Sequence, residues 1–258
     1  MAIHPTAVVD ARAQVADSAE IGPFCVIGAE VEIGAGVRLM AHVYVEGPTF
    51  IGEDNLFFPY STVGVASQDL KYRGERAETR IGRRNRIREF VTIHRGTEGG
   101  GRLTSIGDDN LLMAYVHVAH DARIGDNTVL ANGVTVGGHV TVGDWAVIGA
   151  FTGLHQYCRV GRHVMIGGYS VVTQDVLPFS VTVSEREIKT FGANRVGMER
   201  RGFATDTIEG LQRAFRLLTR SGLNTAQALE RIAAEIPPFA ELEELLEFIR
   251  DSERGVIK

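Results

Sequence analysis

An aliphatic residue recurs at every sixth position along most of the chain, and this period constrains the fold more than any other feature. The series begins at Ile3 and Val9, is interrupted at residues 69–80 and 99–105, and ends with the hexapeptide that starts at Val172. It comprises 26 hexapeptides, of which 25 begin with Ile, Leu or Val. A short fixed period of this kind is typical of strands that wind into stacked coils.

The other positions of the hexapeptide indicate how the coils are built. Counting the aliphatic residue as position 1, position 5 is always small or medium-sized, and position 2 is glycine in 13 of the 26 hexapeptides. Because side chains alternate between the two faces of a strand, positions 1 and 5 can point into one interior, about 4.8 Å from the next coil. Glycine at position 2 lets the backbone turn without a Cβ clash. Three strands and three corners then make one 18-residue coil.

This pattern predicts an all-β parallel β-helix over residues 1–184. It resembles the left-handed parallel β-helix of many acyl- and acetyltransferases, and the hand is implied by that resemblance, since general connection rules favour right-handed crossovers. The 30 glycines and the 7% of aromatic residues suit a tight, repetitive backbone.

The remaining residues, 185–258, are predicted to form a junction and a C-terminal α-helical cap. Apolar residues from about position 204 recur at three- and four-residue spacing, which indicates amphipathic helices. Asn224 is placed to cap a second helix, and Pro237 and Pro238 separate it from a third. Such a cap would cover the open end of the solenoid. The expected buried positions are Ile208, Leu211, Phe215, Leu218, Ala228, Leu229, Ile232, Leu242, Leu245, Leu246 and Ile249.

Charge and composition exclude several classes of partner. The net charge of −5 gives no reason to expect nucleic acid or an anionic membrane surface. No apolar run approaches the roughly 20 residues that a membrane span needs. The start, "MAIHPTAVVD", lacks the features of a signal peptide, so we expect a cytoplasmic protein. Cys25 and Cys158 both fall at position 5, roughly 30 Å apart at the spacing between coils, which is too far for a disulfide.

Histidines gather at one corner of the predicted prism. When faces are assigned cyclically, both interruptions leave from the same corner, one coil apart. His120, His139 and His155 fall on the face that ends at this corner, in three consecutive coils. Residues 18 positions apart lie one above the other, so the register predicts a column of His120, Gly138 and Gln156, flanked by His117, His139 and His155.

Two chemistries suit this column. In the first, His120 is a general base that Asp121 orients, and the backbone N–H of Gly138 is free to stabilise an oxyanion. In the second, three imidazoles hold Zn²⁺ with an open position, as in a metal-dependent hydratase. We prefer the first and expect no metal, because His117, His139 and His155 occupy different hexapeptide positions. A third hypothesis is a non-catalytic scaffold whose loops bind a partner.

Six motifs carry a more specific resemblance. "QDLKY" (68–72), "IREFVTIHRGT" (87–97), "DNLLMAYVHVAHD" (109–121), "GGHV" (137–140), "LHQY" (154–157) and "ERRGF" (199–203) resemble the UDP-N-acetylglucosamine O-acyltransferase family along essentially the whole chain. The resemblance implies transfer of a (3-hydroxy)acyl group from acyl carrier protein to the glucosamine 3-position, the first step of lipid A biosynthesis. It implies no cofactor beyond this co-substrate. It assigns His120 as general base, Asp121 as its orienting partner and Gly138 as oxyanion donor.

The same resemblance implies further contacts. The family is trimeric, with sites between neighbouring prisms. Val196 departs from the family, since an acidic residue that contacts ribose often stands there, and some relatives acylate a 3-amino sugar instead. The implied contacts are Asp69, Lys71, His117, His139, His155 and Gln156 for sugar, phosphate or thioester arm, Asn194, Arg200 and Arg201 for the nucleotide, and Met165 and Gly168 for the end of the acyl chain.

A docking face for the carrier protein is suggested by arginine spacing. Arg213, Arg216 and Arg220 fall at i, i+3 and i+7 of the first long helix and would share one face. Because acyl carrier protein is acidic, we expect this face to help dock it. The alternative is an ordinary solvated helix face.

Overall fold

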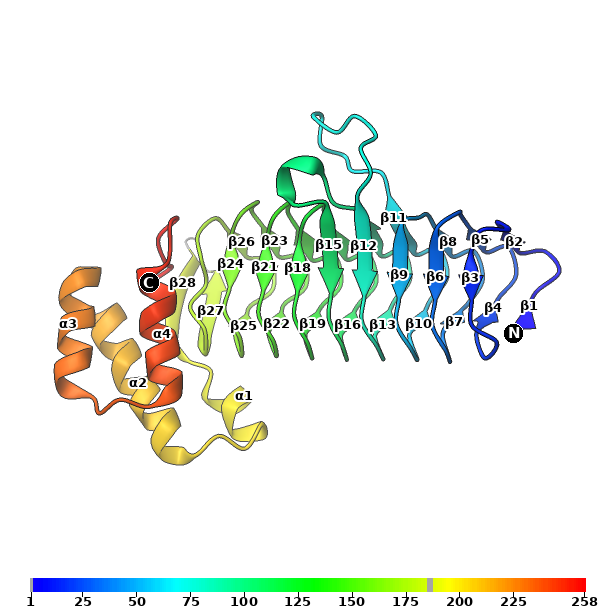
Figure 1. The fold of residues 1–258 in the computed structure, drawn as a ribbon. Coiled ribbons are helices and arrows are strands. Elements are labelled where there is room, and N and C mark those ends of the chain that lie inside the picture. The colour runs from blue at the N-terminus through cyan, green and yellow to red at the C-terminus, as the bar shows by residue number, and fades with distance from the viewer. Residues whose placement is uncertain (1, 185–187) are drawn as a thin grey trace.

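The chain forms a long three-sided prism with a helical domain at one end (Figure 1). This computed structural model describes residues 2–184 and 188–258, without the side chains of Ser184 and Ile188. The short strands of each face pair in parallel from coil to coil, and with one antiparallel strand at the end of the first sheet they form three sheets of 11, 9 and 8 strands. We call them sheets A, B and C, and name each edge of the prism after the two sheets that it joins.

The strands of each sheet follow one another along the prism. Sheet A contains β1 (Ala2–Ile3), β4 (Glu20–Ile21), β7 (Arg38–Leu39), β10 (Leu56–Phe57), β13 (Arg86–Ile87), β16 (Leu111–Leu112), β19 (Val129–Leu130), β22 (Val147–Ile148), β25 (Met165–Ile166), β27 (Ser180–Ser184) and β28 (Ile188–Ala193). Sheet B contains β2 (Val8–Val9), β5 (Val26–Ile27), β8 (Tyr44–Val45), β11 (Thr62–Val65), β14 (Thr92–His94), β17 (His117–Val118), β20 (Thr135–Val136), β23 (Gly153–Leu154) and β26 (Val171–Val172). Sheet C contains β3 (Gln14–Val15), β6 (Val31–Ile33), β9 (Thr49–Ile51), β12 (Glu78–Ile81), β15 (Leu103–Ile106), β18 (Arg123–Ile124), β21 (Thr141–Val142) and β24 (Arg159–Val160).

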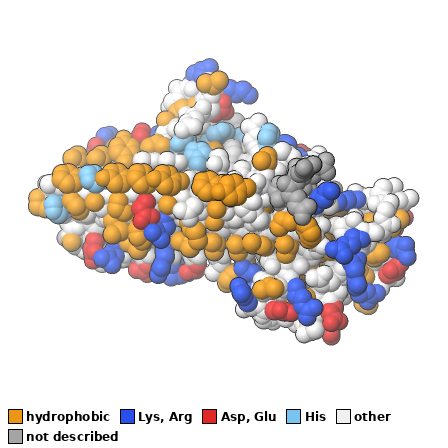
Figure 2. All heavy atoms as spheres, turned by 180° about the vertical axis from the view of Figure 1, so that it is seen from behind, with side chains coloured by type: hydrophobic (Ala, Val, Ile, Leu, Met, Phe, Trp, Pro, Cys, Tyr) orange, Lys and Arg blue, Asp and Glu red, His pale blue; other side chains and the backbone are white. Residues whose placement is uncertain are grey.

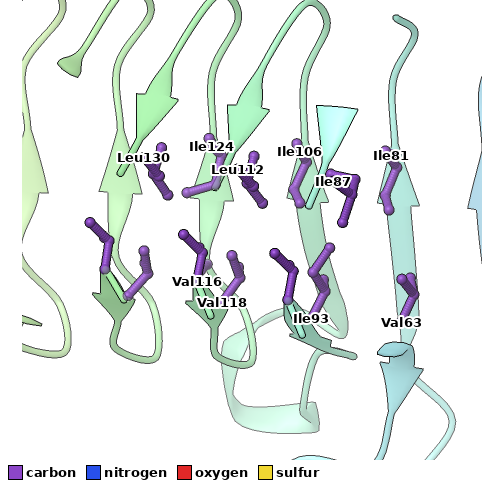
Figure 3. Close-up of a cluster of buried hydrophobic side chains, with 14 of the residues drawn as sticks. Val63, Ile81, Ile87, Ile93, Ile106, Leu112, Val116, Val118, Ile124 and Leu130 are labelled. Carbon is purple, nitrogen blue, oxygen red and sulfur yellow. The ribbon is translucent and has the colours of Figure 1, made fainter. Parts of the chain in front are cut away.

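The interior of the prism is a ladder of position-1 and position-5 side chains. Figure 3 shows Ile81, Ile106 and Ile124 on one side of the core, facing Val63 and Ile93 on the other. The position-1 residues from Ile21 to Val172 are at most 4% exposed. Burying an aliphatic side chain of this size contributes about 1.5–3 kcal/mol, so the repeat itself supplies the stabilising core. Both cysteines are buried and free, as their position-5 placement predicted.

The A–B edge carries aromatic side chains that the repeat did not predict. Most corners hold a residue with a left-handed backbone, such as Phe90 with φ 58° and Tyr115 with φ 65°. Rings of successive coils stack with centroids about 5 Å apart, in a row made of Phe24, His42, Tyr60, Phe90 and Tyr115. Figure 2 shows hydrophobic side chains gathered in rows along the prism, with charged side chains below these rows and at the helical end.

The predicted helical cap is present, and it closes the end of the solenoid. Its helices are α1 (Arg195–Arg200), α2 (Thr205–Arg220), α3 (Thr225–Glu235) and α4 (Ala240–Arg250). Leu177 and Phe179 of the last coil share a buried cluster with Leu211 and Phe215 of α2. The predicted cap of α3 is confirmed, since Asn224 accepts a hydrogen bond from Gln227 N–H at 2.9 Å. All the expected positions are buried except Leu229, which packs partly buried against the cluster.

Two elements of the junction were not predicted. β27 and β28 form an antiparallel pair at the end of sheet A, and the short helix α1 follows directly. The predicted boundary after residue 184 coincides with residues 185–187, which lie outside the described residues. Within the part of the chain that is described, no helix has the length and apolar character to span a bilayer.

Candidate active site

Both insertions and the histidine column lie along the B–C edge, as the repeat predicted. The first loop joins β11 to β12, and the second, which contains the 3-10 helix η1 (Glu98–Gly100), joins β14 to β15. Figure 1 shows the two loops rising side by side from the prism. His120, His139 and His155 occupy the corners after β17, β20 and β23 of sheet B. The register of 18 residues is confirmed by the partners of Thr135, which are His117 below and Gly153 above.

His120 is held by a buried carboxylate. Its Nδ1 lies 2.9 Å from Oδ2 of Asp121, whose side chain is completely buried. Thr97 donates to the same carboxylate twice, from Oγ1 at 2.6 Å and from its backbone N–H at 2.9 Å. The Asp121 backbone N–H donates to Oγ1 of Thr104 at 2.7 Å. Thr97 lies in the loop between β14 and β15, and Thr104 lies in β15. This segment therefore fixes the carboxylate and, through it, the orientation of the imidazole.

A close approach of the second loop explains one of its glycines. A Cβ on Gly100 would lie 2.0 Å from Cγ and 2.2 Å from Oδ2 of Asp121. Only a residue without a side chain lets the backbone pass so near the carboxylate. The glycine-rich run "EGGG" therefore seals Asp121 from solvent while leaving the His120 ring, 13% exposed, at the surface.

The His120 ring packs directly against Gly138 of the next coil. A Cβ at this position would lie 2.6 Å from Cε1 and 2.7 Å from Nε2 of His120, so the imidazole lies directly over the glycine. Neighbouring coils fix the two corners, because His139 N–H donates to His120 O at 3.1 Å and Tyr157 N–H donates to Gly138 O at 3.0 Å. Within the described ranges, the Gly138 N–H has no protein acceptor. A basic nitrogen and an unpaired donor thus line one small space.

The neighbouring imidazoles favour their uncharged forms. Burial, together with the proximity of His117 and His120, lowers the pKa of His94 to about 4. Burial and the nearby His120 lower the pKa of His117, whose Nδ1 hydrogen-bonds Oγ1 of Thr92 at 2.7 Å. Burial also lowers the pKa of His139, against the opposing charges of Asp121 and Asp69. The Asp121 carboxylate lies 2.9 Å from Nδ1 of His120, whereas no carboxylate hydrogen-bonds His94 or His117 among the described residues.

Two buried imidazoles make stability depend on pH. The pKa of His94 and of His163 is lowered to about 4 by burial, so folding favours the neutral rings. Because an unfolded histidine titrates near 6.5, the unfolded chain binds more protons between pH 6.5 and 4, and stability falls as pH drops through this window. Between pH 6.5 and 4, each ring accounts for a loss of about 3 kcal/mol in the free energy of unfolding. We expect the free energy of unfolding, measured by urea denaturation, to decrease steadily from pH 6.5 to 4.

One variant isolates this effect. His163 is stacked between Trp145 and Phe179, and its Nδ1 has no hydrogen-bond partner among the described residues, so His163→Phe keeps the packing and removes the titration. Compared with wild type, this variant should bind about one proton fewer on unfolding between pH 6.5 and 4. An unchanged slope in His163→Phe would contradict the assignment.

The residues that could bind a metal ion differ from the histidines considered in the sequence. Among described residues, the one group of three that could converge on an ion is His120, Asp121 and His139, with donor atoms within 4.8 Å of one another. Neither His117 nor His155 belongs to it. The Asp121 oxygens already accept hydrogen bonds from Thr97 and His120, so this geometry orients a base.

The remaining predicted contacts of the B–C edge lie on its loops and upper coils. Asp69 caps the first loop by accepting from Lys71 N–H at 2.9 Å, and its charge acts on His139. His155 and Gln156 are exposed. Arg254, from the C-terminal tail, brings Nη2 to 3.5 Å from Nδ1 of His155. Sequence reasoning missed Arg254, because only the docking of the tail onto the last coils brings it there.

Sequence reasoning also missed His94 and Thr97. Both belong to the "IHRGT" motif that carried the resemblance, but neither was singled out. The rings of His94 and His117 meet edge-on at 4.8 Å. Thr97 had no signal of its own, since its role depends on the second loop folding back over the next coil. Its hydroxyl and amide are the groups that position Asp121.

The residues predicted to contact the nucleotide lie on another edge. Arg201 donates to Trp145 O at 3.1 Å and its guanidinium lies over the Trp145 ring at 5.2 Å, on the C–A edge between β21 and β22. Asn194 is buried and donates to His163 O at 3.0 Å while it caps α1 by accepting from Gly197 N–H. Arg200 is exposed on α1. One chain therefore does not bring these residues to His120.

The predicted acyl-end residues lie near the third edge. Met165 faces outward on sheet A, and Gly168 follows it at the A–B corner after β25. A Cβ on Gly168 would lie 3.1 Å from the carbonyl oxygen of Ala150, so the close approach of the neighbouring coil also favours glycine here. The structure does not place Met165 or Gly168 beside His120 within one chain.

The three arginines predicted to share a helix face do so. Arg213, Arg216 and Arg220 are exposed and line one groove on α2, together with Arg195 and Phe191. Glu209 lies in the same groove, and Arg213 donates to Glu235 O at 3.1 Å. The groove is therefore strongly cationic at its rim.

Family models match both parts of the chain. The model for bacterial transferase hexapeptides (six repeats) matches residues 103–138, and the model for domain 2 of UDP-N-acetylglucosamine O-acyltransferase matches residues 175–257. A hexapeptide prism with this histidine edge and this cap places the chain among the hexapeptide acyltransferases. The predicted left-handed parallel β-helix with a C-terminal helical domain is confirmed by these matches and by the solved structures below.

Full-length relatives identify the family. Acyl-[acyl-carrier-protein]–UDP-N-acetylglucosamine O-acyltransferases from Thermodesulfovibrio yellowstonii and Herminiimonas arsenicoxydans are 45% and 44% identical, with 99% of each chain covered. The UDP-N-acetylglucosamine acyltransferase structure from Bacteroides fragilis matches with a TM-score of 0.97 at 40% identity, covering 99% of this chain and 100% of that chain. The Moraxella catarrhalis enzyme matches with a TM-score of 0.96 at 42% identity, with both chains fully covered. The chain belongs to the UDP-N-acetylglucosamine O-acyltransferase family and is an acyltransferase.

Proposed function

We propose that the chain transfers a (3-hydroxy)acyl group from acyl carrier protein to the 3-hydroxyl of UDP-N-acetylglucosamine, the first step of lipid A biosynthesis. The names of the full-length relatives support both substrates. The observation that carries the chemistry is the packing of the His120 ring against Gly138, whose backbone N–H has no acceptor among the described residues. A base and an oxyanion donor within one coil spacing are what acyl transfer to an alcohol needs.

His120, Asp121 and Gly138 account for every proton transfer and charge in the proposed acyl transfer. His120 Nε2 takes the proton of the sugar 3-hydroxyl as its oxygen attacks the thioester carbonyl. Asp121 stabilises the imidazolium through Nδ1, 2.9 Å away. The carbonyl oxygen becomes an oxyanion that accepts a hydrogen bond from the Gly138 N–H. Collapse of the tetrahedral intermediate breaks the carbon–sulfur bond, and the imidazolium returns its proton to the leaving thiolate, so that no cofactor is needed.

A complete substrate site requires more than one copy of the chain. His120, Arg201 and Gly168 lie on the B–C, C–A and A–B edges respectively, so a single prism cannot offer them to one substrate. Outward positions of sheet A in the relevant coils are apolar and half-buried, namely Leu111, Val129, Val147 and Met165. Such a face is suited to packing against another prism. We therefore propose a homotrimer in which edges of neighbouring copies complete each site.

The acceptor could carry a 3-hydroxyl or a 3-amino group. Val196, 57% exposed at the start of α1, offers no polar group to a ribose. The base has the same task with both acceptors, because His120 removes one proton from the attacking hydroxyl or amino group in either case. We propose the 3-hydroxyl acceptor, which the names of the full-length relatives support.

One assay tests this function. The purified protein is mixed with 3-hydroxyacyl carrier protein and either UDP-N-acetylglucosamine or its 3-amino analogue, and products are identified by mass spectrometry. We expect an ester from the first acceptor. Turnover that a chelator abolishes would support a metal-dependent reaction instead, and complete lack of turnover would support a scaffold. The predicted cytoplasmic location stays a prediction.

We propose that the arginine groove of α2 docks the acidic carrier protein. Arg213, Arg216 and Arg220 present three positive charges on one face, where complementary charge speeds association. Reversing all three to Glu should raise KM for the carrier-bound donor by about 10-fold or more at low salt, with a smaller effect at high salt. The matched control is Arg38→Glu on the opposite half of the prism, where Arg38 pairs with Glu20. Equal KM values in the triple variant and wild type would refute the docking face.

A further inference from the structure

The C-terminal tail is built into the last coils of the prism. Val256 forms a parallel bridge with Asp175, whose backbone N–H donates to Gly255 O at 3.1 Å. Ile257 N–H donates to Asp175 O at 3.1 Å, and its side chain, 3% exposed, belongs to the hydrophobic core of the prism. The tail is therefore fixed to the solenoid by hydrogen bonds and by burial, and Arg254, the residue before Gly255, is fixed with it.

The guanidinium of Arg254 is held at the B–C edge. Its Nε and Nη2 donate to Thr173 O at 3.3 and 3.0 Å, and Nη2 lies 3.5 Å from Nδ1 of His155. In return, Gln174 Nε2 donates to Arg254 O at 3.3 Å. Arg254 is nevertheless exposed, and among the described residues its Nη1 has no hydrogen-bond acceptor and its charge has no carboxylate partner. A positive charge that is held in place, exposed and unpaired is prepared to bind an anion, because little further ordering is needed when the anion arrives.

A row of amide side chains leads from the reacting groups to this cation. Gln174 stands 18 residues after Gln156, so it continues the column of His120, Gly138 and Gln156, and the pairing of β26 with β23 confirms the register. Both glutamines are exposed. From His120 to the coil of Gln174 there are three coil spacings, which amount to about 14 Å along the prism. The reacting groups, the two amides and the cation therefore share one edge of one chain.

The two loops approach His120 from the opposite direction. They leave the prism after β11 and β14, in the two coils that precede the coil of β17 and His120. Lys71, a predicted substrate contact with a positive charge, is in the first of these loops. An acceptor held by that loop leaves the other side of His120, toward Arg254 and the helical cap, to the donor.

The donor arm has the length and the charge that this arrangement fits. Acyl carrier protein holds its acyl group by a thioester at one end of a flexible arm, and the other end of the arm is a phosphate. Amide groups and short carbon chains lie between the two ends, and the extended arm is about as long as four peptide residues, or about 14 Å. A thioester between His120 and Gly138 therefore places the phosphate near Arg254, where a guanidinium can bind it through charge-assisted hydrogen bonds.

We infer that Arg254 binds the phosphate of the donor arm and so places the thioester beside His120. The inference rests on the proposed acyl transfer from acyl carrier protein. Gln156 and Gln174 hydrogen-bond the amide groups of the arm between its two ends. Arg254 is thus a binding residue for the donor, supplied by the tail, and it takes no part in proton transfer.

Two small donors isolate the phosphate. They are S-acyl phosphopantetheine and S-acyl pantetheine, which carry the same acyl group and differ only in the phosphate. We expect wild type to use the phosphorylated donor with a kcat/KM that is higher by about 10–100-fold, the range expected for hydrogen bonds to a charged group. Arg254→Gln should lose activity on the phosphorylated donor alone and so use both donors about equally, and Arg254→Lys should keep part of the preference.

The matched control is Arg250→Gln. It removes the same charge from the end of α4, where Arg250 is exposed and faces a groove between α3 and α4. It should leave the preference between the two donors as in wild type. Melting temperatures of all variants show whether the tail remains docked.

The other outcomes separate the inference from the proposed function. If wild type uses both small donors equally, or neither of them, the phosphate is not recognised and the inference fails. An equal loss on both donors in Arg254→Gln, with a lower melting temperature, would mean that the arginine only holds the tail in place. A raised KM for the UDP-sugar, with an unchanged preference between the donors, would mean that the anion at Arg254 belongs to the acceptor. If wild type acylates no UDP-sugar even from the carrier protein, the proposed function fails, irrespective of Arg254.

Discussion

Replacement of His120 by alanine is expected to lower kcat by about 10²–10⁴-fold, the usual contribution of a general base. The ring is partly exposed, and Asp121 keeps its hydrogen bonds from Thr97, so we expect the fold to survive. His120→Gln, which keeps a polar side chain of similar length, should be equally impaired because an amide cannot take up the proton. Steady-state rates with saturating acyl carrier protein and UDP-sugar measure the effect.

The control for His120 is a histidine elsewhere on the prism. His42 is exposed in the aromatic row of the A–B edge, and His42→Ala should retain wild-type turnover. Circular dichroism and the melting temperature establish that His120→Ala is folded. A folded His120→Ala variant with near wild-type kcat would exclude His120 as the base.

Replacement of Gly138 by alanine is expected to be nearly as damaging, for a steric reason. The new methyl group would lie 2.6–2.7 Å from the His120 ring, closer than non-bonded carbon and nitrogen atoms approach, so the imidazole must move. Displacing the base and covering the amide should cost about 10²–10³-fold in kcat, comparable to removing an oxyanion donor. KM for the UDP-sugar should change less than kcat, since the amide acts mainly on the transition state.

Gly28 provides the matched control for Gly138. It follows sheet B at the same edge of the prism, several coils away, and an added Cβ would find its nearest atom at 3.4 Å, an ordinary contact. Gly28→Ala should therefore leave kcat and the melting temperature close to wild type. If Gly138→Ala retained full activity, the amide and the ring would not share the reacting space.

Much of the site geometry follows from the repeat alone. A period of six and a coil of 18 residues place His120, Gly138 and Gln156 on one edge without further information, and they place both loops there too. This succeeds because each coil repeats the backbone of the previous one, so that position in the sequence translates directly into position in space. Asp121 could be assigned as the partner of His120 because it is the next residue in the sequence, and the hydrogen bond between the two side chains is local.

The features missed from the sequence depend on segments that leave the repeat. Thr97 reaches Asp121 only because the second loop folds back onto the next coil, and Arg254 reaches His155 only because the tail docks on the last coils. The pairing of β27 with β28 also follows no hexapeptide rule. In each case the contact joins residues whose separation in sequence carries no periodic signal.

The sequence by itself determined the prism, its aliphatic core, the amphipathic helices and the edge that carries the histidines. It could do so because burial requires apolar side chains at fixed intervals, so that the spacing of apolar residues in the sequence directly indicates which positions are buried. Only the tertiary structure decided that Arg201 lies on an edge different from that of His120, and how Asp121 is buried. These depend on which backbone segments approach one another, and on the space that side chains leave between them, which no periodicity encodes.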